Sequence, residues 1–216
     1  MIHHLAKSHS LVNAWMNDLR DINTQQDRAR FRRNLERIGE VAAYEISKTM
    51  PYVPVDVQTP LGIYSGQALA HQPVLGTIFR AGFPLYQGLL NFFDKADSAF
   101  IAAYRKHDKS GSFHIHQGYL TCPDISNRTL IVADPMLATG ASLITAFEEL
   151  LDNGTPLAVH VVCAIASTEG IETLRKRFPD FTLWIGDIDE QLTAKGYIVP
   201  GLGDAGDLCF GEKKQH

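Results

Sequence analysis

The chain has 216 residues, of which 45% are hydrophobic and 20% are charged, and its formal net charge at pH 7 is −4. This length and composition are typical of one globular domain with a sizeable core, so we expect residues 1–216 to form a single domain. The acidic balance gives no electrostatic reason to expect nucleic acid or an anionic membrane as a partner.

The sequence shows no sign of a membrane or secretory segment. No apolar run approaches the ~20 residues that a membrane-spanning helix needs, and the N-terminus lacks the hydrophobic core of a signal peptide. The three cysteines, Cys122, Cys163 and Cys209, are far apart and in no CxxC pair. Reduced thiols fit this pattern better than a disulfide frame or a zinc site, so we expect a cytosolic protein.

The first predicted element is an amphipathic helix over residues 28–48. Its apolar side chains repeat at helical spacing along one face, at Phe31, Leu35, Ile38, Ala42 and Ile46. Arginines occupy much of the remaining surface, at Arg30, Arg32, Arg33 and Arg37. These arginines could contact nucleic acid, but glutamates interspersed among them favour a solvated, charge-balanced face.

Apolar runs of strand length follow along the chain, at residues 53–57, 74–79, 99–104, 130–133, 158–165 and 181–185. Helical patterns fill most gaps between the later runs, notably at residues 82–93, 142–151 and 169–178. This alternation indicates an α/β fold with a mostly parallel central sheet flanked by helices. In such sheets ligands bind beyond the carboxyl ends of the strands.

Two arginines follow predicted strands. Arg80 comes directly after residues 74–79, and Arg105 comes directly after residues 99–104 and before a polar stretch. A planar guanidinium at this edge can bind pyrophosphate in a bidentate fashion, and a basic loop could close over the ligand. The alternative is that each arginine forms an ordinary surface ion pair.

Two groups of side chains have spacings that a metal could use. His114 and His116 alternate in FHIHQ, but no third ligand is apparent nearby, so a solvated strand face is favoured. Asp187 and Asp189, with Glu190, follow the last predicted strand. They could bind Mg²⁺ through water, although we favour capping of a following helix.

Residues 130–142, LIVADPMLATGAS, predict a phosphate-binding turn. A buried strand ends before Asp134, and the small residues from Thr139 to Ser142 lead into a helix. The first N–H groups of a helix lack internal partners and carry the positive end of its dipole, so a phosphate monoester fits there. A carboxylate beside it repels phosphate but accepts hydrogen bonds from sugar hydroxyls, which indicates a ribose 5-phosphate site. The alternative is an Asp-Pro turn followed by an N-capping Thr139 or Ser142.

A glycine-rich segment, KGYIVPGLGDAGDLCFG, spans residues 195–211. Its glycines and Pro200 argue against a stable helix or a regular strand, while its apolar residues argue against disorder. We therefore expect an ordered irregular loop whose backbone groups recognise a flat heterocycle by its edge. Uracil offers an acceptor, a donor and an acceptor, and each mismatch with another base would cost about 1–3 kcal/mol.

These segments resemble those of the uracil phosphoribosyltransferase family, a branch of the type I phosphoribosyltransferases. DPMLATG resembles the family's motif for phosphoribosyl pyrophosphate (PRPP), and residues 195–211 resemble its uracil-binding loop nearly residue for residue. FRAG around Arg80 and the dipeptide Tyr104-Arg105 resemble its pyrophosphate-binding segments. The resemblance extends over almost the whole chain, from DLRDINT near Arg20 to the end.

The resemblance implies a set of site residues. PRPP would be bound by Arg80, Arg105, Asp134, Pro135, Met136, Leu137, Ala138, Thr139, Gly140, Ala141, Ser142 and Asp204. Uracil would be held by Ile198, Gly203, Asp204 and Ala205, mainly through main-chain atoms. Catalysis would depend on Asp134, Asp204 and Arg105. Mg²⁺ is the implied cofactor, carried mainly by PRPP and not by dedicated protein ligands.

The implied activity is transfer of phosphoribose from PRPP to uracil, giving UMP and pyrophosphate in pyrimidine salvage. The implied fold is phosphoribosyltransferase-like with a small C-terminal hood region that binds the base, and the implied assembly is a homo-oligomer. Whether GTP binds stays open. The alternative function is a catalytically weak sensor of uracil or UMP that regulates RNA, against which the acidic charge and the complete set of site residues weigh.

The chain also departs from the family in places. Ala141 stands where the family usually has glycine, which could alter the phosphate turn slightly. Residues 83–87 replace a version that contains glycine and aspartate, and residues 106–119 are basic and rich in histidine where relatives are acidic. We expect these changes to affect the rate, the subunit contacts and any effector response more than the reaction.

Overall fold

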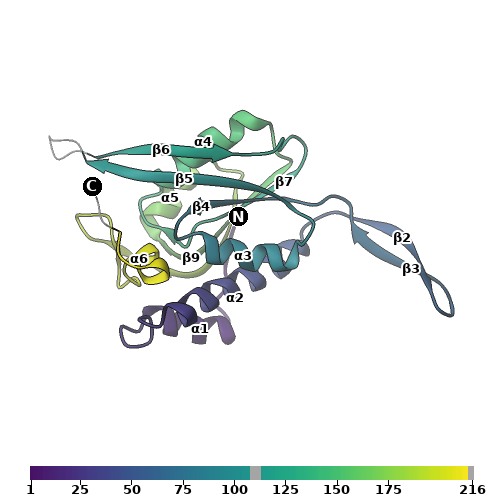
Figure 1. The fold of residues 1–216 in the computed structure, drawn as a ribbon, viewed down its shortest axis with the longest axis horizontal. Helices are drawn as coiled ribbons and strands as arrows, with labels where there is room; N and C mark the ends of the chain where they lie inside the picture. The colour runs from purple at the N-terminus through teal and green to yellow at the C-terminus, as the bar shows by residue number, and fades with distance from the viewer. Residues whose placement is uncertain (108–112, 214–216) are drawn as a thin grey trace.

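A mostly parallel sheet forms the centre of the computed structural model, which describes the backbone of residues 1–107 and 113–213 and the side chains of residues 1–102 and 118–213. The strand order is β1-β10-β9-β7-β4-β5-β6 (Figure 1). Its strands are β1 (Ile2–His4), β4 (Val74–Phe79), β5 (Asp97–His107), β6 (Phe113–Thr121), β7 (Thr129–Ala133), β9 (Ala158–Ser167) and β10 (Thr182–Asp189). Along this path the neighbours are parallel, apart from β5 and β6.

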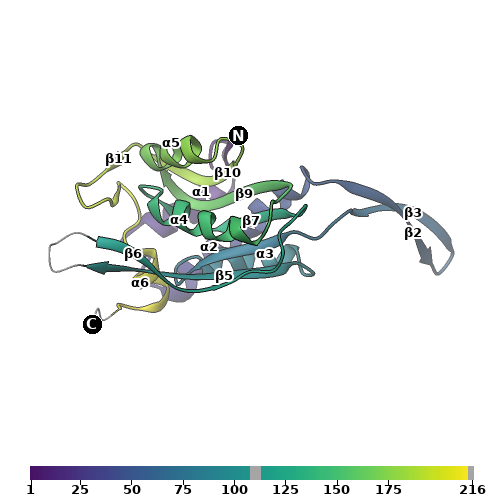
Figure 2. The same cartoon turned by 90° about the horizontal axis from the view of Figure 1, so that it is seen from above.

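Helices cover both faces of the sheet, which confirms the predicted fold class. One face carries α1 (Leu11–Arg20), α2 (Arg28–Ser47) and α3 (Phe83–Phe92), and the other carries α4 (Ala141–Leu150) and α5 (Thr168–Arg177) (Figure 1; Figure 2). Two hydrophobic clusters correspond to these two layers. The apolar runs of β4, β7 and β9 are buried because both faces of the sheet are covered.

The long helix α2 matches its prediction to within one residue. The Asp27 side chain caps its first turn by accepting a hydrogen bond from the Ala29 amide (3.0 Å). Every predicted core position is buried, at Phe31, Leu35, Ile38, Ala42 and Ile46. Arg33 forms ion pairs with Glu36 (3.0 Å) and Glu40 (2.9 Å), so acids do balance this arginine. Neither α2 nor any other helix of the described ranges is long and apolar enough to cross a membrane.

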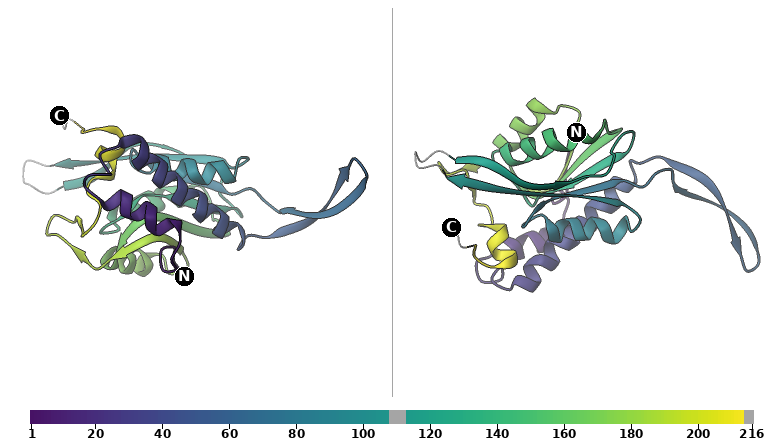
Figure 3. Two further views of the ribbon diagram at one scale, coloured as in Figure 1. Left: turned by 90° about the horizontal axis from the view of Figure 1, so that it is seen from below. Right: turned by 45° about the horizontal axis from the view of Figure 1, so that its top comes forward.

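A separate antiparallel hairpin projects away from the sheet (Figure 1; Figure 3). It consists of β2 (Tyr52–Thr59) and β3 (Gly62–Leu69), which pair only with each other. The run at residues 53–57 is therefore a strand, as predicted, and it lies outside the parallel sheet. Val53 and Val57 are 42% and 47% exposed, because β-branched residues favour an extended chain without specifying which strand it pairs with.

Candidate active site

The carboxyl ends of β4 and β7 lie together at one edge of the sheet. The two strands are parallel neighbours, and Thr77 of β4 lies opposite Ala133 of β7. Arg80 and Asp134 directly follow the two strands, so both leave the sheet at this edge. The turn after β4 also packs on the end of β7, since a Cβ atom added to Gly82 would lie 2.8 Å from the Ala133 carbonyl oxygen. Two of the predicted site segments are thus adjacent.

Asp134 is half-buried and well anchored at the end of β7. Its backbone N–H donates to the Val162 carbonyl oxygen of β9 (3.1 Å), and its Oδ1 lies 3.5 Å from the Met136 amide nitrogen. The next residues form β8 (Met136–Leu137), which also pairs with β9. Two amides of β9 donate to the Pro135 carbonyl oxygen, at 3.1 and 3.0 Å. The apolar insert after Asp134 is therefore held rigidly by the sheet.

The turn from Thr139 to Ser142 forms an open helix N-terminus. Gly140 has a φ of +83°, in the left-handed region that favours glycine, and α4 begins at Ala141. Among the described residues no side chain caps α4 from the N-cap position, although Thr139 Oγ1 lies 3.4 Å from the Ala141 amide nitrogen. Ala141 stands where glycine is usual in the family, but it is already part of the helix and needs no left-handed backbone. The expected alteration of the turn at this position has no structural basis.

The start of α5 supports the residue that precedes this turn. The Ala138 carbonyl oxygen accepts a hydrogen bond from Ser167 Oγ (2.5 Å), which in turn accepts one from the Gly170 amide (2.8 Å). A Cβ atom at Gly170 would overlap the Ala138 carbonyl oxygen. Ser167 and Gly170 were not predicted as supports of this turn, because their only local signal is a serine that precedes a helix.

Arg80 currently forms an ion pair and does not extend freely into solvent. Its Nη2 lies 2.9 Å from Asp207 Oδ1, and its Nη1 donates to the Gly211 carbonyl oxygen (3.2 Å). The Phe79–Arg80 peptide bond is cis. Arg80 also lines an open depression of about 320 Å³ together with Phe79, Phe83 and Phe210. The ion-pair alternative is thus realised, and a contact with pyrophosphate stays a prediction.

Arg105 lies within β5, not after it, so the predicted strand end at residue 104 is wrong. The backbone of Arg105 lies opposite Ile115 of β6, in a pairing that extends to His107. Ala102 of β5 is opposite Phe79, the last residue of β4, so Arg105 lies beyond the end of β4 at the same edge. The side chains of Arg105, His114 and His116 are outside the described residues.

The glycine-rich segment returns to this edge and is more regular than expected. It contains a short strand, β12 (Ile198–Val199), and a helix, α6 (Ala205–Phe210), which the prediction of an irregular loop missed. A Cβ atom added to Gly196 would lie 3.3 Å from Thr139 Cγ2, and one added to Gly206 would lie 3.6 Å from Arg80 Nη2. The segment therefore contacts both the phosphate turn and the turn after β4.

The predicted uracil-binding residues surround the turn between β12 and α6. Ile198 and Ala205 are buried at 5% and 1% exposure, and Gly203 has a φ of +91°. Asp204 is the N-cap of α6, because its Oδ1 accepts a hydrogen bond from the Asp207 amide (3.1 Å). The structure thus brings the predicted base-binding residues together.

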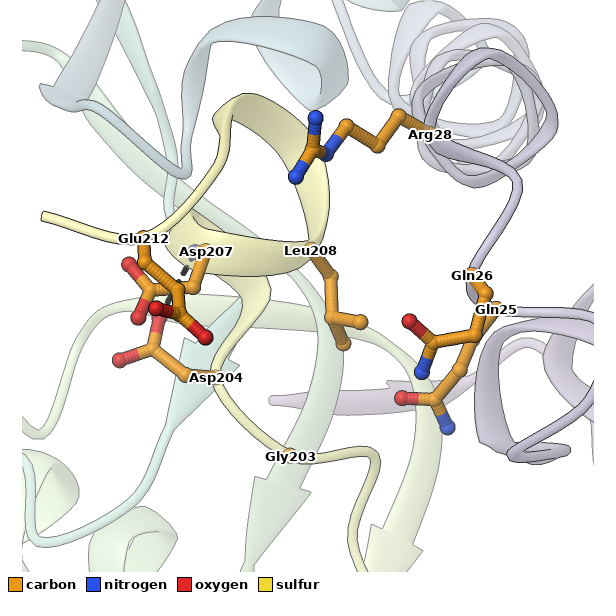
Figure 4. Close-up of a pocket in the computed structure, with 8 residues that line it drawn as sticks. All are labelled: Gln25, Gln26, Arg28, Gly203, Asp204, Asp207, Leu208 and Glu212. Atoms are coloured by element: carbon orange, nitrogen blue, oxygen red, sulfur yellow. Dashed lines mark hydrogen bonds between the residues drawn. The ribbon is translucent and has the colours of Figure 1, made fainter.

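A pocket of about 320 Å³ opens between α6 and the connection from α1 to α2 (Figure 4). It is lined by Gln25, Gln26, Arg28, Gly203, Asp204, Asp207, Leu208 and Glu212. In Figure 4 the carboxylates of Asp204, Asp207 and Glu212 gather on one side of the pocket, with Gln25 and Gln26 on the other. The N-terminal part of the chain thus forms one wall of the region that contains Gly203.

Asp187 and Asp189 do not cap a helix, so the favoured prediction for them is wrong. β10 continues to Asp189 because its pairing with β9 extends to Ser167, and β11 (Gln191–Leu192) follows. Both carboxylates bind Arg20 at the end of α1, with Nη2 at 2.8 Å from Asp187 Oδ2 and 2.8 Å from Asp189 Oδ1. The two acids are therefore partners of an arginine and not of the next helix.

Cys163 and Cys209, near this edge, are unreactive thiols. Burial raises the pKa of Cys209 to about 12 and also raises the pKa of Cys163 well above its ordinary value. Both thiols are therefore protonated at neutral pH and are poor nucleophiles. Within the described ranges, no group of three or more His, Cys, Asp or Glu side chains could hold a metal ion.

Known proteins resemble this chain over nearly its whole length. A sequence profile described as uracil phosphoribosyltransferase matches residues 6–212. The uracil phosphoribosyltransferase of Porphyromonas gingivalis is 48% identical over 211 residues, which cover 97% of this chain and 98% of that protein. The corresponding Methanococcus vannielii protein is 41% identical over 202 residues, with 91% and 84% covered. The solved structure of the AQ2163 protein from Aquifex aeolicus has a TM-score of 0.86 and 32% identity, with 98% of both chains covered.

Proposed function

The chain belongs to the uracil phosphoribosyltransferase family, and on this premise we propose that the edge beyond β4 and β7 is where phosphoribose passes from PRPP to uracil. The protein is accordingly a pentosyltransferase that forms UMP and pyrophosphate in uracil salvage. One observation carries the location of the site. The open N-terminus of α4 comes shortly after Asp134 and contacts the glycine-rich segment through Thr139 and Gly196.

The 5-phosphate of PRPP is proposed to bind at the start of α4. The amides of the first helical turn and the positive end of the helix dipole favour an anion, and the small residues from Thr139 to Ser142 allow it to approach closely. Asp134 would then accept hydrogen bonds from the ribose hydroxyls. Its anchorage by β9 supports this role, because an orienting group must itself be held in place.

Arg80 and Arg105 are proposed to neutralise pyrophosphate as it leaves. The anomeric carbon becomes cation-like while the leaving group gains charge, as in other oxocarbenium chemistry of sugars. The Arg80 side chain is 40% exposed, and an exposed ion pair contributes only about 0–1 kcal/mol, so Arg80 could exchange Asp207 for pyrophosphate. The cysteines described above are not needed, because the transfer requires no covalent nucleophile.

The base is proposed to bind against the turn that carries Ile198, Gly203 and Ala205. Main-chain donors and acceptors there would pair with O2, N3–H and O4 of uracil. The burial of Ile198 and Ala205 supports this proposal, because hydrogen bonds discriminate best where a mismatch cannot be relieved by water.

Mg²⁺ is proposed as the cofactor, arriving with PRPP. This ion is usually bound through one or two carboxylates plus substrate phosphates. Asp207 has a partly exposed carboxylate paired with Arg80, and the partly exposed carboxylate of Asp204 lies 3.7 Å from Lys213 Nζ. This donor set fits an ion held mainly by its substrate, with Asp204 as its protein contact. When bound, the ion would neutralise charge on the pyrophosphate.

We also propose a cytosolic homo-oligomer built from chains that each form a single domain. The projecting hairpin supports the assembly, since Leu61 is 100% exposed and Ile63 and Tyr64 are 72% and 62% exposed. Apolar side chains gathered on an exposed arm are typical of a protein contact, and a second copy would cover them. The cytosolic location still rests on the cysteines, all three of which are free in the described chain.

Incubation of the purified protein with labelled uracil, Mg²⁺ and PRPP tests the proposed activity. We expect labelled UMP and an equal amount of pyrophosphate. The alternative, a sensor without turnover, would bind uracil or UMP and release no pyrophosphate. Nothing in the family relationship supports that sensor, and uracil binding without product formation would overturn the proposed activity.

A further inference from the structure

The backbone N–H and the backbone carbonyl of Gly201 both form hydrogen bonds with the ion pair of Arg20 and Asp189. Arg20 Nη1 donates to the Gly201 carbonyl oxygen (3.0 Å) and to Asp189 Oδ2 (2.9 Å). The same Asp189 oxygen accepts a hydrogen bond from the Gly201 amide (2.8 Å), and its Oδ1 accepts one from Arg20 Nη2 (2.8 Å). The Asp189 and Arg20 side chains are only 6% and 19% exposed. A bidentate pair thus clamps the backbone of a single glycine.

The clamped glycine lies in the middle of the proposed uracil-binding turn. Gly201 has a φ of +64°, and a Cβ atom there would overlap the Ile198 carbonyl oxygen. It therefore packs directly on one peptide that is proposed to read the base, and it precedes Gly203, which belongs to the same set. Fixing the N–H and the carbonyl of Gly201 fixes the orientation of the peptides on either side.

Gln25 extends the same support to the other end of the turn. It is 7% exposed, and its Nε2 donates to the Arg20 carbonyl oxygen (3.0 Å). Its Oε1 is 3.7 Å from the position of a Cβ atom on Gly203, and Figure 4 shows Gln25 on the far side of the pocket from Asp204. The end of α1 and the residues after it thus contact the turn at two points.

We propose that Arg20 and Asp189 are positioning residues that set uracil affinity and base selectivity without touching either substrate. This inference rests on the proposed function, because it presupposes that residues 198–205 read the base. A backbone donor or acceptor that moves by a fraction of an ångström pairs poorly with a rigid heterocycle, whereas PRPP is held mainly at α4, outside this turn, and is affected less.

If the ion pair were purely structural, breaking it would lower the stability of the fold and would change the KM for uracil and the KM for PRPP alike. The test therefore compares Asp189→Asn with Asp187→Asn. Asp187 also binds Arg20 (2.8 Å), but its other contacts are His4 and the Ile188 amide, not Gly201. We expect Asp189→Asn to raise the KM for uracil about tenfold or more, because an amide cannot accept all three hydrogen bonds. The KM for PRPP should stay within about twofold.

The selectivity for uracil over cytosine should fall in Asp189→Asn and not in Asp187→Asn. Arg20→Lys keeps the charge but loses the planar fork, so it should show the same uracil-specific loss in smaller measure. An unchanged KM for uracil in Asp189→Asn, or equal changes in the KM of both substrates, would overturn the inference. Failure of the wild-type protein to form UMP would instead overturn the proposed function, so the two failures are distinguishable.

Discussion

Asp134 is the residue on which the proposed ribose contact depends. It follows a buried strand, and its backbone is anchored by β9. Asp134→Asn removes the charge and keeps the shape, so we expect kcat to fall about 10²-fold, a typical effect of losing an orienting contact, with little change in the KM for uracil. Steady-state kinetics with both substrates, alongside a melting curve that shows an intact fold, provide the measurement. Unchanged kinetics would remove Asp134 from the site.

His160 gives the fold a pH dependence that has no part in the reaction. Trp184 Nε1, which can only donate, lies 3.0 Å from His160 Nδ1, so this nitrogen must be an unprotonated acceptor. Burial lowers the pKa of His160 from 6.5 to about 4, assisted by electrostatic interaction with His3 and the N-terminal amine. Between pH 6.5 and about 4, His160 is therefore protonated in the unfolded state and neutral in the folded state.

Stability should accordingly fall as the pH drops through this window. Well above pH 6.5 the histidine is neutral in both states, and by pH 5 we expect its contribution to the free energy of unfolding to have dropped by about 2 kcal/mol. Urea unfolding at pH 7 and pH 5 measures this loss against His160→Asn, in which an amide oxygen can accept the Trp184 hydrogen bond without titrating. Identical pH dependence in the two proteins would show that His160 does not contribute.

The residues of this site differ in how far the sequence reveals them. Asp134 was predictable because its signal is local, a buried strand followed by a small-residue turn and a helix. Arg20, Asp189 and Gln25 were not predictable as a unit, because Arg20 and Asp189 are 169 positions apart in sequence and meet only through the sheet. A carboxylate pair after a strand is compatible with capping, metal binding or an ion pair, and only the fold decides among them.

At the element scale, the start of α4 depends on one left-handed residue. Gly140→Ala would place a side chain at a φ of +83°, which costs about 1–2 kcal/mol and displaces the amides of the first turn. We expect a lower melting temperature and a KM for PRPP that is raised about tenfold, the loss typical of one charge-assisted hydrogen bond. Ala141→Gly is the matched control. Ala141 is already helical and the substitution keeps its backbone amide, so the KM of this variant for PRPP should not change. Equal effects at both positions would contradict the phosphate assignment.

The end of β5 is expected to provide the second contact with pyrophosphate. Arg105→Ala should raise the KM for PRPP and lower kcat, with little change in the melting temperature. Arg105→Lys should recover only part of the activity, because the ammonium keeps the charge and loses the planar fork. Full activity of the alanine variant would show that this part of β5 is an ordinary solvated strand.

The elements themselves were predicted well where both faces of a strand are buried. β4, β7 and β9 appear in the sequence as continuous apolar runs, which is the pattern of a covered parallel sheet. The separate hairpin of β2 and β3 was not predicted, because its exposed valines produce the same apolar run in the sequence as core valines do. α6 was missed because glycine is a poor helix former. This short helix depends on the Asp204 cap and on packing against α2, to which the hydrogen bond from Arg32 to the Cys209 carbonyl oxygen (2.6 Å) contributes.

At the scale of the whole molecule, the proposed active site is assembled from segments spread along the entire chain. The phosphate turn follows β7, the base-binding turn lies near the C-terminus, and α1 supports that turn from the N-terminal part. The order of strands could not be derived from the sequence, since the composition of an apolar run does not specify which strands it pairs with. The function was nevertheless accessible, because residues 134–140 and 195–211 each resemble a motif of the same family.

The proposed active site transfers phosphoribose to uracil and recognises the base by its edge. The most direct measurement is a competition in which the enzyme receives Mg²⁺, limiting PRPP and equimolar labelled uracil and cytosine. Mispairing at two edge positions would cost about 2–6 kcal/mol, so we predict UMP as the product with a kcat/KM at least about 30-fold above that for cytosine. Comparable formation of UMP and CMP would rule out recognition of uracil by its edge, and the absence of any nucleotide would rule out the transfer itself.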